Sequence, residues 1–162
     1  MSHIVIAEAL VVVATITVAS VLASAMTMKA NDISHMFRLY EVNAKDKVYS
    51  HITIIFATNV TDTSVKIWIK NTGLKEIHGD LIAKSDVFFG PKGNFTRVPH
   101  ESTTTLPPLW NYTIVNDDGD GRWDPCETLE VTITWDTILN PGEYYVKFVL
   151  YNGVSDEYVF SI

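Results

Sequence analysis

An uncharged run of 20 apolar and small residues, from Ala9 to Met28, lies near the start of this 162-residue chain. An α-helix rises about 1.5 Å per residue, so a helix of this length spans about 30 Å, the thickness of the hydrocarbon core of a bilayer. The segment therefore belongs either in a membrane or in a bundle of helices. The rest of the chain must fold as a domain attached to it.

The flanks of the run bear on whether it is retained and which way it faces. A cleavable signal peptide needs a basic segment before its apolar core and a small-x-small site after it. Residues 1–3 supply no basic segment, but Ala23–Ser24–Ala25 has the form of a cleavage site, so we expect an uncleaved anchor, with removal as the alternative. Lys29 and Arg38 follow the run, and by the positive-inside rule they predict a cytoplasmic C-terminal side.

Small residues within the run are spaced for helix association. Ala19 and Ala23, like Ser20 and Ser24, lie four residues apart, where small side chains let two helices approach closely in lipid. The helix can therefore associate with a second helix, or it can be a monomeric membrane tether. Glu8, just before the run, can reach the lipid headgroups or pair with the N-terminus of a neighbouring subunit.

After the run the helical pattern continues, and then the periodicity changes. Four apolar residues recur at the i, i+3, i+4, i+7 spacing of one helix face: Ile33, Met36, Phe37 and Tyr40. The stretch 44–47 breaks that pattern, and from Val48 onward side chains alternate with a period of two. We therefore expect a transmembrane helix over 1–28, a juxtamembrane helical linker over 29–47 and a β-domain over 48–162.

The β-domain contains short candidate strands separated by turn residues. The strand at 48–57 is rich in β-formers on both faces and is predicted to be central in its sheet. Thr61–Asp62 predicts a hairpin to a strand at 65–70, and Asn152–Gly153 predicts a tight turn with positive φ at both residues. Further candidate strands are 77–83, 86–89, 95–98, 110–115, 128–135, 144–151 and 157–162. Many short strands without a second helix predict a mainly β fold. We expect an N-terminal hydrophobic helix followed by an immunoglobulin-like antiparallel β-sandwich.

Charge and cysteine content exclude several classes of function. The net charge is −7 and the basic residues are scattered, so nucleic acid is not an expected partner. Cys126 is the only cysteine, which excludes an intramolecular disulfide and a zinc site with several thiolates. The five histidines occur singly and no phosphate loop, serine elbow or paired-carboxylate motif is present, so we expect no enzyme activity.

One stretch has the spacing of a calcium-binding loop. Counted from Asn116, oxygen-bearing side chains stand at positions 1, 3, 5, 9 and 12, with glycine at position 6. A hard cation takes about six to eight oxygens, and the glycine permits the sharp turn that wraps them around it. The expected structural Ca²⁺ ligands are Asn116, Asp118, Asp120, the backbone carbonyl of Arg122, Asp124 and Glu127. An acidic, glycine-rich connection without a metal is the alternative.

Three N-x-Thr sequons, at Asn59, Asn94 and Asn111, are typical of an extracellular domain. In a chain rich in Ser and Thr, one or two such sequons also arise by chance. They favour a β-domain outside the cell, against the orientation that Lys29 and Arg38 predict.

Short segments spread over nearly the whole chain carry a family resemblance. They are Ala7–Leu10 with its early Glu8, Ala14–Ile16, Ala23–Ala25, Lys70–Gly73, Asp86–Gly90 and Gly142–Gly153. Together with a hydrophobic helix that leads into a β-sandwich, they resemble the archaeal flagellin-like proteins of type IV pilin-like architecture. Within that group the chain is most similar to the FlaG/FlaF family of archaellum stator proteins.

The resemblance implies a structural component of the archaellum, a membrane-anchored stator subunit that self-assembles and braces the motor against the cell envelope. Its implied partners are further copies of the chain, a FlaF-like stator subunit, the surface-layer protein and the membrane. Its implied place is the archaeal cell membrane, crossed once, with the β-domain between membrane and surface layer. Exposed strand edges, at 65–69 or in the C-terminal strand, are the expected contact surfaces.

Two other functions stay open. The chain can be an archaellin or pilin-like filament subunit: the basic segment that precedes the helix in such precursors is missing from this sequence, but a mature chain would have lost it. It can also be a membrane-tethered β-sandwich that binds a ligand, which a deep polar pocket in the sandwich would indicate.

Overall fold

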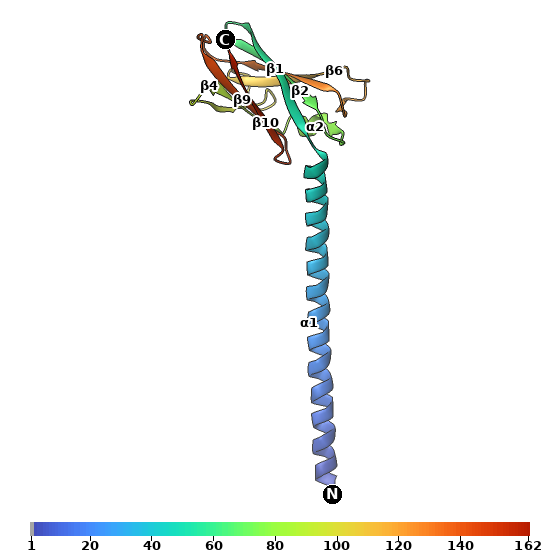
Figure 1. Ribbon diagram of the computed structural model, residues 1–162. Helices are drawn as coiled ribbons and strands as arrows, with labels where there is room; N and C mark the ends of the chain where they lie inside the picture. Colours follow the sequence, from blue (N-terminus) through green and yellow to red (C-terminus); the bar gives the residue numbers. More distant parts are fainter. Residues whose placement is uncertain (1) are drawn as a thin grey trace. The chain divides into compact units, whose positions relative to one another are not determined.

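The computed structural model describes residues 2–162 (Figure 1). The chain divides into two compact units, Met1–Asn43 and Ala44–Ile162. In chain order the elements are α1 (Ser2–Tyr49), β1 (Ile52–Thr61), β2 (Ser64–Asn71), β3 (Ile77–His78), α2 (Gly79–Ile82), β4 (Asp86–Pro91), β5 (Thr96–Val98), β6 (Leu109–Val115), β7 (Arg122–Trp123), β8 (Thr128–Thr134), β9 (Glu143–Val149) and β10 (Ser155–Ser161).

α1 continues through the stretch that breaks the apolar pattern. Ala44, Lys45 and Lys47 all have high helix propensity, so the loss of an apolar stripe at 44–47 marks a change of environment and not the end of the helix. The backbone N–H of Ser50 donates to the carbonyl of Asp46 at 3.1 Å. The helix therefore ends at Tyr49, and the first strand begins at Ile52 instead of Val48.

Two four-stranded antiparallel sheets make up most of the second unit. Their strand orders are β1-β2-β8-β6 and β10-β9-β4-β5, and a small two-stranded sheet pairs β3 with β7. The β1–β2 hairpin closes where Thr61 pairs with Ser64, as the sequence predicts. The predicted immunoglobulin-like antiparallel β-sandwich is confirmed.

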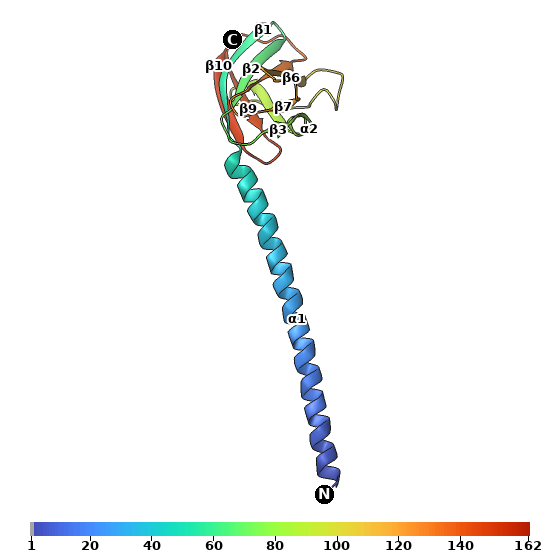
Figure 2. The same cartoon turned by 90° about the vertical axis from the view of Figure 1, so that its right-hand side faces the viewer.

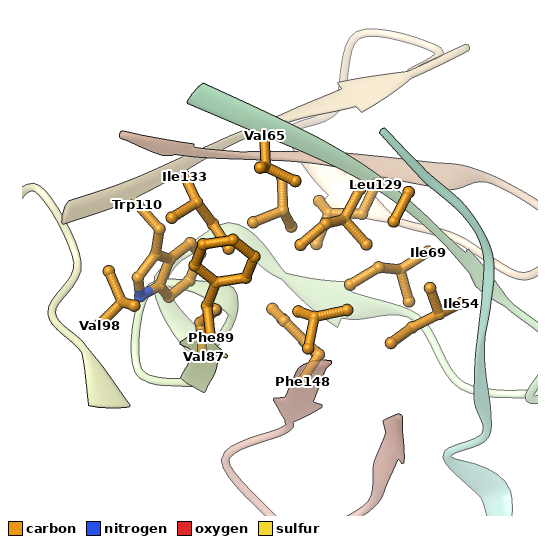
Figure 3. Packing of buried hydrophobic residues seen from close by; sticks show 14 of the residues in the cluster. Ile54, Val65, Ile69, Val87, Phe89, Val98, Trp110, Leu129, Ile133 and Phe148 are labelled. Carbon is orange, nitrogen blue, oxygen red and sulfur yellow. The ribbon is translucent and has the colours of Figure 1, made fainter. Parts of the chain in front are cut away.

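The core lies between the two sheets (Figure 3). Period-two alternation on β2 and β8 turns every second side chain inward, so that Val65, Ile69, Leu129 and Ile133 are fully buried. Phe148 of the opposite sheet meets Trp110 edge to face, with ring centroids 5.9 Å apart. Each such side chain contributes about 1.5–3 kcal/mol through burial, which makes this layer the main source of stability.

Two predictions about strand edges are wrong. β1 is an edge strand and not central, because it stands at the end of its sheet with β2 as its paired neighbour, and the apolar residues on its second face are largely exposed. Conversely, Val65 to Ile69 belong to β2, which is hydrogen-bonded on both sides by β1 and β8 and offers no free edge. β10, the C-terminal strand, is an edge strand as expected.

Two local predictions are also corrected. The strand expected over 77–83 shortens to β3, and the chain then makes the single turn α2, closed by a bond from the Ala83 N–H to the Gly79 carbonyl at 3.1 Å. The Asn152–Gly153 turn has positive φ only at Gly153, at 83°. The loop closed by the Leu150 N–H and the Val154 carbonyl has three residues and not two. A three-residue loop needs positive φ only at its last residue, which is Gly153.

The two sheets are joined by hydrogen bonds along both sides of the sandwich. On one side β1 and β10 run next to each other (Figure 2), and the Ile54 N–H donates to Asp156 Oδ2 at 2.7 Å. On the other side Trp110 of β6 donates its N–H to the Pro99 carbonyl at 3.0 Å and accepts from Glu101 at 2.9 Å. These bonds satisfy edge groups that would otherwise be open to pairing.

His100 lies at this second junction with a poorly solvated ring. The Ser102 N–H donates to Nδ1 at 3.1 Å, so Nε2 carries the proton in the neutral ring, and the buried Nε2 has no hydrogen-bond partner among residues 2–162. The ring packs edge to face on Trp110, at 4.5 Å between centroids. Burial lowers the pKa of His100, and the nearby Glu101 carboxylate only partly opposes this shift.

We predict that acid weakens this junction. Because the pKa of His100 in the folded chain lies below its unfolded value of about 6.5, the unfolded chain takes up the proton first as pH falls, and the free energy of unfolding decreases until pH reaches the folded pKa. His100→Asn keeps an acceptor for the Ser102 N–H but does not titrate, so it should lose less stability between about pH 7 and about pH 5. Denaturant melts at both pH values measure this, with the exposed His78→Asn as control. Identical pH profiles for wild type and His100→Asn would contradict the assignment.

Candidate functional site

The apolar stretch of α1 satisfies its polar groups internally. In the first unit a helical segment near the N-terminus is long and apolar enough to cross a membrane, and its side chains are exposed. Between Ala9 and Met28 every Ser and Thr hydroxyl donates to a backbone carbonyl of the preceding turn at 2.8–2.9 Å: Thr15, Thr17, Ser20, Ser24 and Thr27. A helix in hydrocarbon must meet this condition, because no water is present to pair with a free hydroxyl.

The stripe beyond this stretch is apolar and exposed as well. Ile33, Met36, Phe37 and Tyr40 lie together on one face of α1. Their side chains are 52–76% exposed. A continuous apolar face of this kind suits contact with lipid or with another helix.

The outer side of β1 presents an exposed apolar patch. Ile55, Phe56 and Val60 are each at least half exposed, and the register of the β1–β2 pair shifts between Ile54 and Phe56. The shift is a β-bulge that turns Ile55 and Phe56 outward in succession, and the Phe56 ring stacks on Trp68 at 5.7 Å. The apolar character of both faces at 48–57 was the sequence signal for this patch.

A second aromatic strip crosses the outer face of the other sheet. Phe95 packs on Tyr145 at 4.5 Å between ring centroids, and Tyr145 pairs in register with the exposed Val159. A Cβ at Gly90 would lie 2.6 Å from the Asn94 carbonyl oxygen, so a glycine is needed for this turn to fold over the sheet. Tyr145 OH donates to Glu157 Oε2 at 2.7 Å.

The shifted pKa values of Tyr145 and Glu157 fix the charge of this strip. Burial and the Glu157 carboxylate raise the pKa of Tyr145 to about 12. The hydrogen bond from Tyr145 in turn lowers the pKa of Glu157. The strip therefore presents a neutral phenol and a carboxylate at physiological pH.

The acidic loop brings together part of the predicted calcium set. One carboxylate oxygen from each of Asp117, Asp118 and Asp120 lies within 4.8 Å of the others. Asp117 was not among the predicted ligands, while Asp118 and Asp120 were. Each of these carboxylates also accepts backbone N–H bonds within the loop, such as Arg122 N–H to Asp120 Oδ1 at 2.8 Å.

The other predicted ligands have different surroundings. Glu127 Oε2 accepts the Asp124 N–H at 2.8 Å, which closes the turn before β8. The Arg122 guanidinium pairs with Glu76 at 2.6 Å and with Asp120 at 3.5 Å. Asn116 has a φ of 66°, a left-handed conformation that asparagine tolerates better than most residues.

Asp124 is the electrostatic anomaly of this loop. Its Oδ1 is buried and makes no hydrogen bond within the described residues. Burial raises the pKa of Asp124, and the carboxylates of Asp120, Asp118 and Glu76 raise it further against the opposing effect of Arg122. A site with excess negative charge and an unpaired oxygen is one that a cation would stabilise.

The three sequon asparagines have different accessibility. Asn59 on β1 and Asn94 in the β4–β5 turn are exposed. Asn111 on β6 is half-buried, and its Nδ2 donates to Glu101 Oε2 at 3.2 Å. The amides at 59 and 94 are therefore more accessible to a modifying enzyme.

Comparison with known proteins finds relatives over most of the chain. Residues 2–160 match the family model described as archaeal-type flagellin. An uncharacterized protein of Archaeoglobus fulgidus is 31% identical over 166 residues, which cover 99% of each chain.

Two solved structures share the fold. One is the archaellum periplasmic stator protein FlaG from Sulfolobus acidocaldarius, with a TM-score of 0.59 and 24% identity over 68% of this chain and 99% of that chain. The other is a chain of the archaellum periplasmic stator protein complex FlaF and FlaG from the same organism. Its TM-score is also 0.59, with 25% identity over 68% of this chain and 88% of that chain.

Proposed function

Because this chain belongs to the archaeal-type flagellin family, we propose that it is a FlaG-like stator subunit of the archaellum, a structural part that braces the motor against the cell envelope. The observation that carries the proposal is the likeness of the sandwich to a chain of the FlaF and FlaG stator complex at 25% identity. The predicted resemblance to the FlaG/FlaF proteins is confirmed at the level of family and fold.

The proposed mechanism is mechanical. A rotating filament needs a stationary partner that resists its torque, and this partner must be rooted in the membrane and stiff beyond it. The internally bonded hydroxyls of α1 suit a root in lipid, and hydrogen bonds along both sides of the sandwich oppose sliding of one sheet over the other. Neither part requires catalysis.

We place the sandwich on the outer side of the membrane, next to the surface layer. The word periplasmic in the names of the two stator structures supports this side, as do the exposed sequons at Asn59 and Asn94. The flanking Lys29 and Arg38 point the other way, and the positive-inside rule describes a bias that further features of a protein can override. A protease-accessible sandwich on intact cells is the expected topology.

The exposed patch on β1 is the proposed contact surface for further copies of this chain or for a FlaF-like partner. Ile55, Phe56 and Val60 offer exposed apolar area for side-chain packing by a partner, next to the edge at which β1 is bonded to Asp156 of β10. The solved complex of FlaF with FlaG supports a partner of that type. We further propose that the sandwich contacts the surface-layer protein, against which the stator would brace the motor.

A filament subunit is the second candidate function. The match to the archaeal-type flagellin model extends over residues 2–160, which includes the helix as well as the sandwich. In a filament, the small residues at Ala19, Ala23, Ser20 and Ser24 would face neighbouring helices in the filament core.

Deletion of the gene separates these two functions. A stator subunit predicts cells that still assemble filaments by electron microscopy but do not swim. A filament subunit predicts loss of the filament, with this chain found along its length in wild-type cells. Normal swimming of the deletion strain would exclude both.

The contact surface is tested by Phe56→Lys in the detergent-solubilised full chain. A charge on the patch should weaken self-association by about tenfold or more, as loss of a central aromatic anchor does at other interfaces. Analytical ultracentrifugation measures the association constant, and Leu106→Lys, at an exposed apolar residue in a loop away from the patch, is the control. Equal effects of the two substitutions would remove β1 from the interface.

We also propose that the acidic loop binds a structural Ca²⁺ through Asp117, Asp118, Asp120 and Asp124. The close carboxylates and the unpaired, buried Oδ1 of Asp124 support the proposal. Asn116, Arg122 and Glu127 stay predicted ligands that a bound ion would have to recruit, since Glu127 is engaged with the Asp124 N–H.

Calcium at about 100 times its Kd should raise the Tm by several degrees, because binding to the folded state alone adds about 2.7 kcal/mol. The measurement is thermal melting with calcium and with a chelator. The double substitution Asp118→Asn with Asp120→Asn should abolish the difference, whereas the exposed Asp136→Asn should keep it. Equal Tm values for the wild-type chain in calcium and in chelator would end the metal proposal.

A further inference from the structure

The last turn of α1 carries an acidic residue where a helix disfavours one. Asp46 lies next to the C-terminus of α1, where the helix dipole repels negative charge, and aspartate has a low helix propensity. Its tertiary contacts account for it. Lys75 Nζ donates to Asp46 Oδ1, and Tyr151 OH donates to Asp46 Oδ2 at 2.9 Å.

These contacts extend into a closed network, which we name the Asp46 cluster: Asp46, Ser50, Lys75, Tyr151 and Asn152. Lys75 Nζ also donates to Tyr151 OH at 2.9 Å, and Asn152 Nδ2 donates to the fully buried Ser50 Oγ at 2.9 Å. Ser50 Oγ in turn donates to the Asp46 carbonyl at 2.8 Å. Charge-assisted bonds in a partly buried network are stronger than exposed ion pairs, so the cluster can hold its elements together.

The β2–β3 loop holds the chain directly after the helix. Thr72 and Gly73 both donate their N–H to the His51 carbonyl at 2.9 Å, and Leu74 donates to the Tyr49 carbonyl at 2.9 Å. A Cβ at Gly73 would lie 2.5 Å from both His51 N and the Tyr49 oxygen, so only glycine allows this approach. Buried Asn71 fixes the loop through bonds from Nδ2 to the carbonyls of Lys75 and Trp123, each at 2.9 Å.

We propose that the Asp46 cluster and the Gly73 loop form a force-transmitting joint. Residues 44–51 belong to the same compact unit as the sandwich and are bonded to its β2–β3 and β9–β10 loops. A linker held only by its main chain yields to torque by rotation about φ and ψ, whereas parallel side-chain and backbone bonds resist it. The joint rests on the proposed stator function, because it states how load would pass between the sandwich and α1.

Asp46→Ala distinguishes the joint from a local role in the helix. Alanine is the better helix former, so a purely local role predicts equal or slower hydrogen exchange at the end of α1. The joint predicts exchange of the Ser50 and Leu74 amides faster by about tenfold and a Tm lower by about 5 °C, from loss of the tertiary bonds. The full chain in detergent is compared with Lys84→Met, which removes an exposed ion pair with Asp80 at 3.8 Å.

Lys75→Met is the second variant, because it keeps Asp46 and tests the same bonds from the sandwich side. Faster exchange in both variants supports the joint, and rates equal to the Lys84→Met control in both overturn it. In cells, the joint predicts that both variants assemble filaments and swim several-fold more slowly than the control. Normal swimming by variants with fast exchange would overturn the force-transmitting role. Normal swimming of the full deletion would instead overturn the stator function itself.

Discussion

The packing of β2 and β8 against β4 and β9 is the interaction on which the sandwich depends. On all four strands every second side chain is apolar and points inward, and these inward residues are almost fully buried. Phe148 lies between the rings of Trp110 and Trp123, at 5.9 and 6.4 Å between centroids. Interdigitation at this density fixes how one sheet sits on the other, and every edge and loop contact follows from that placement.

Hydrogen bonds at the edges of the sandwich then limit how its two sheets can move. Asp156 reaches from β10 to the backbone of β1, and Pro99 and Glu101 reach the backbone of Trp110 on the other side. Asn71 and Gly73 hold the β2–β3 loop against residues 49–51. Such bonds contribute modestly to stability one by one, but they limit the directions in which the two sheets can move. The proposed stator role, which is to resist force, depends on this property more than on a pocket.

Much of this architecture was predictable from local patterns. The uncharged run from Ala9 to Met28, the period-two alternation after it and the Thr61–Asp62 turn each specify their own element. The two predictions that failed, for 48–57 and for 44–47, concern segments whose outcome depends on residues far away in the sequence. Apolar residues on both faces of 48–57 indicated a central strand, yet β1 lies at the edge of its sheet, and a bulge turns Ile55 and Phe56 to its exposed face. Likewise the loss of the apolar stripe at 44–47 indicated a helix end, although Asp46 is held there by residues about 29 and about 105 positions away.

Neighbouring residues alone indicated most of the helical and extended segments, a helix suited to lipid and an acidic loop before β8, because propensity, periodicity and hydropathy are local properties. Which strands are edges, and which of the loop carboxylates meet, depended on the packing of the folded chain. That packing also decided that Asp46, Lys75, Tyr151 and Asn152 form one cluster. Sheet order and side-chain encounters depend on how distant segments pack around the common core, and a short window of sequence carries no record of that packing.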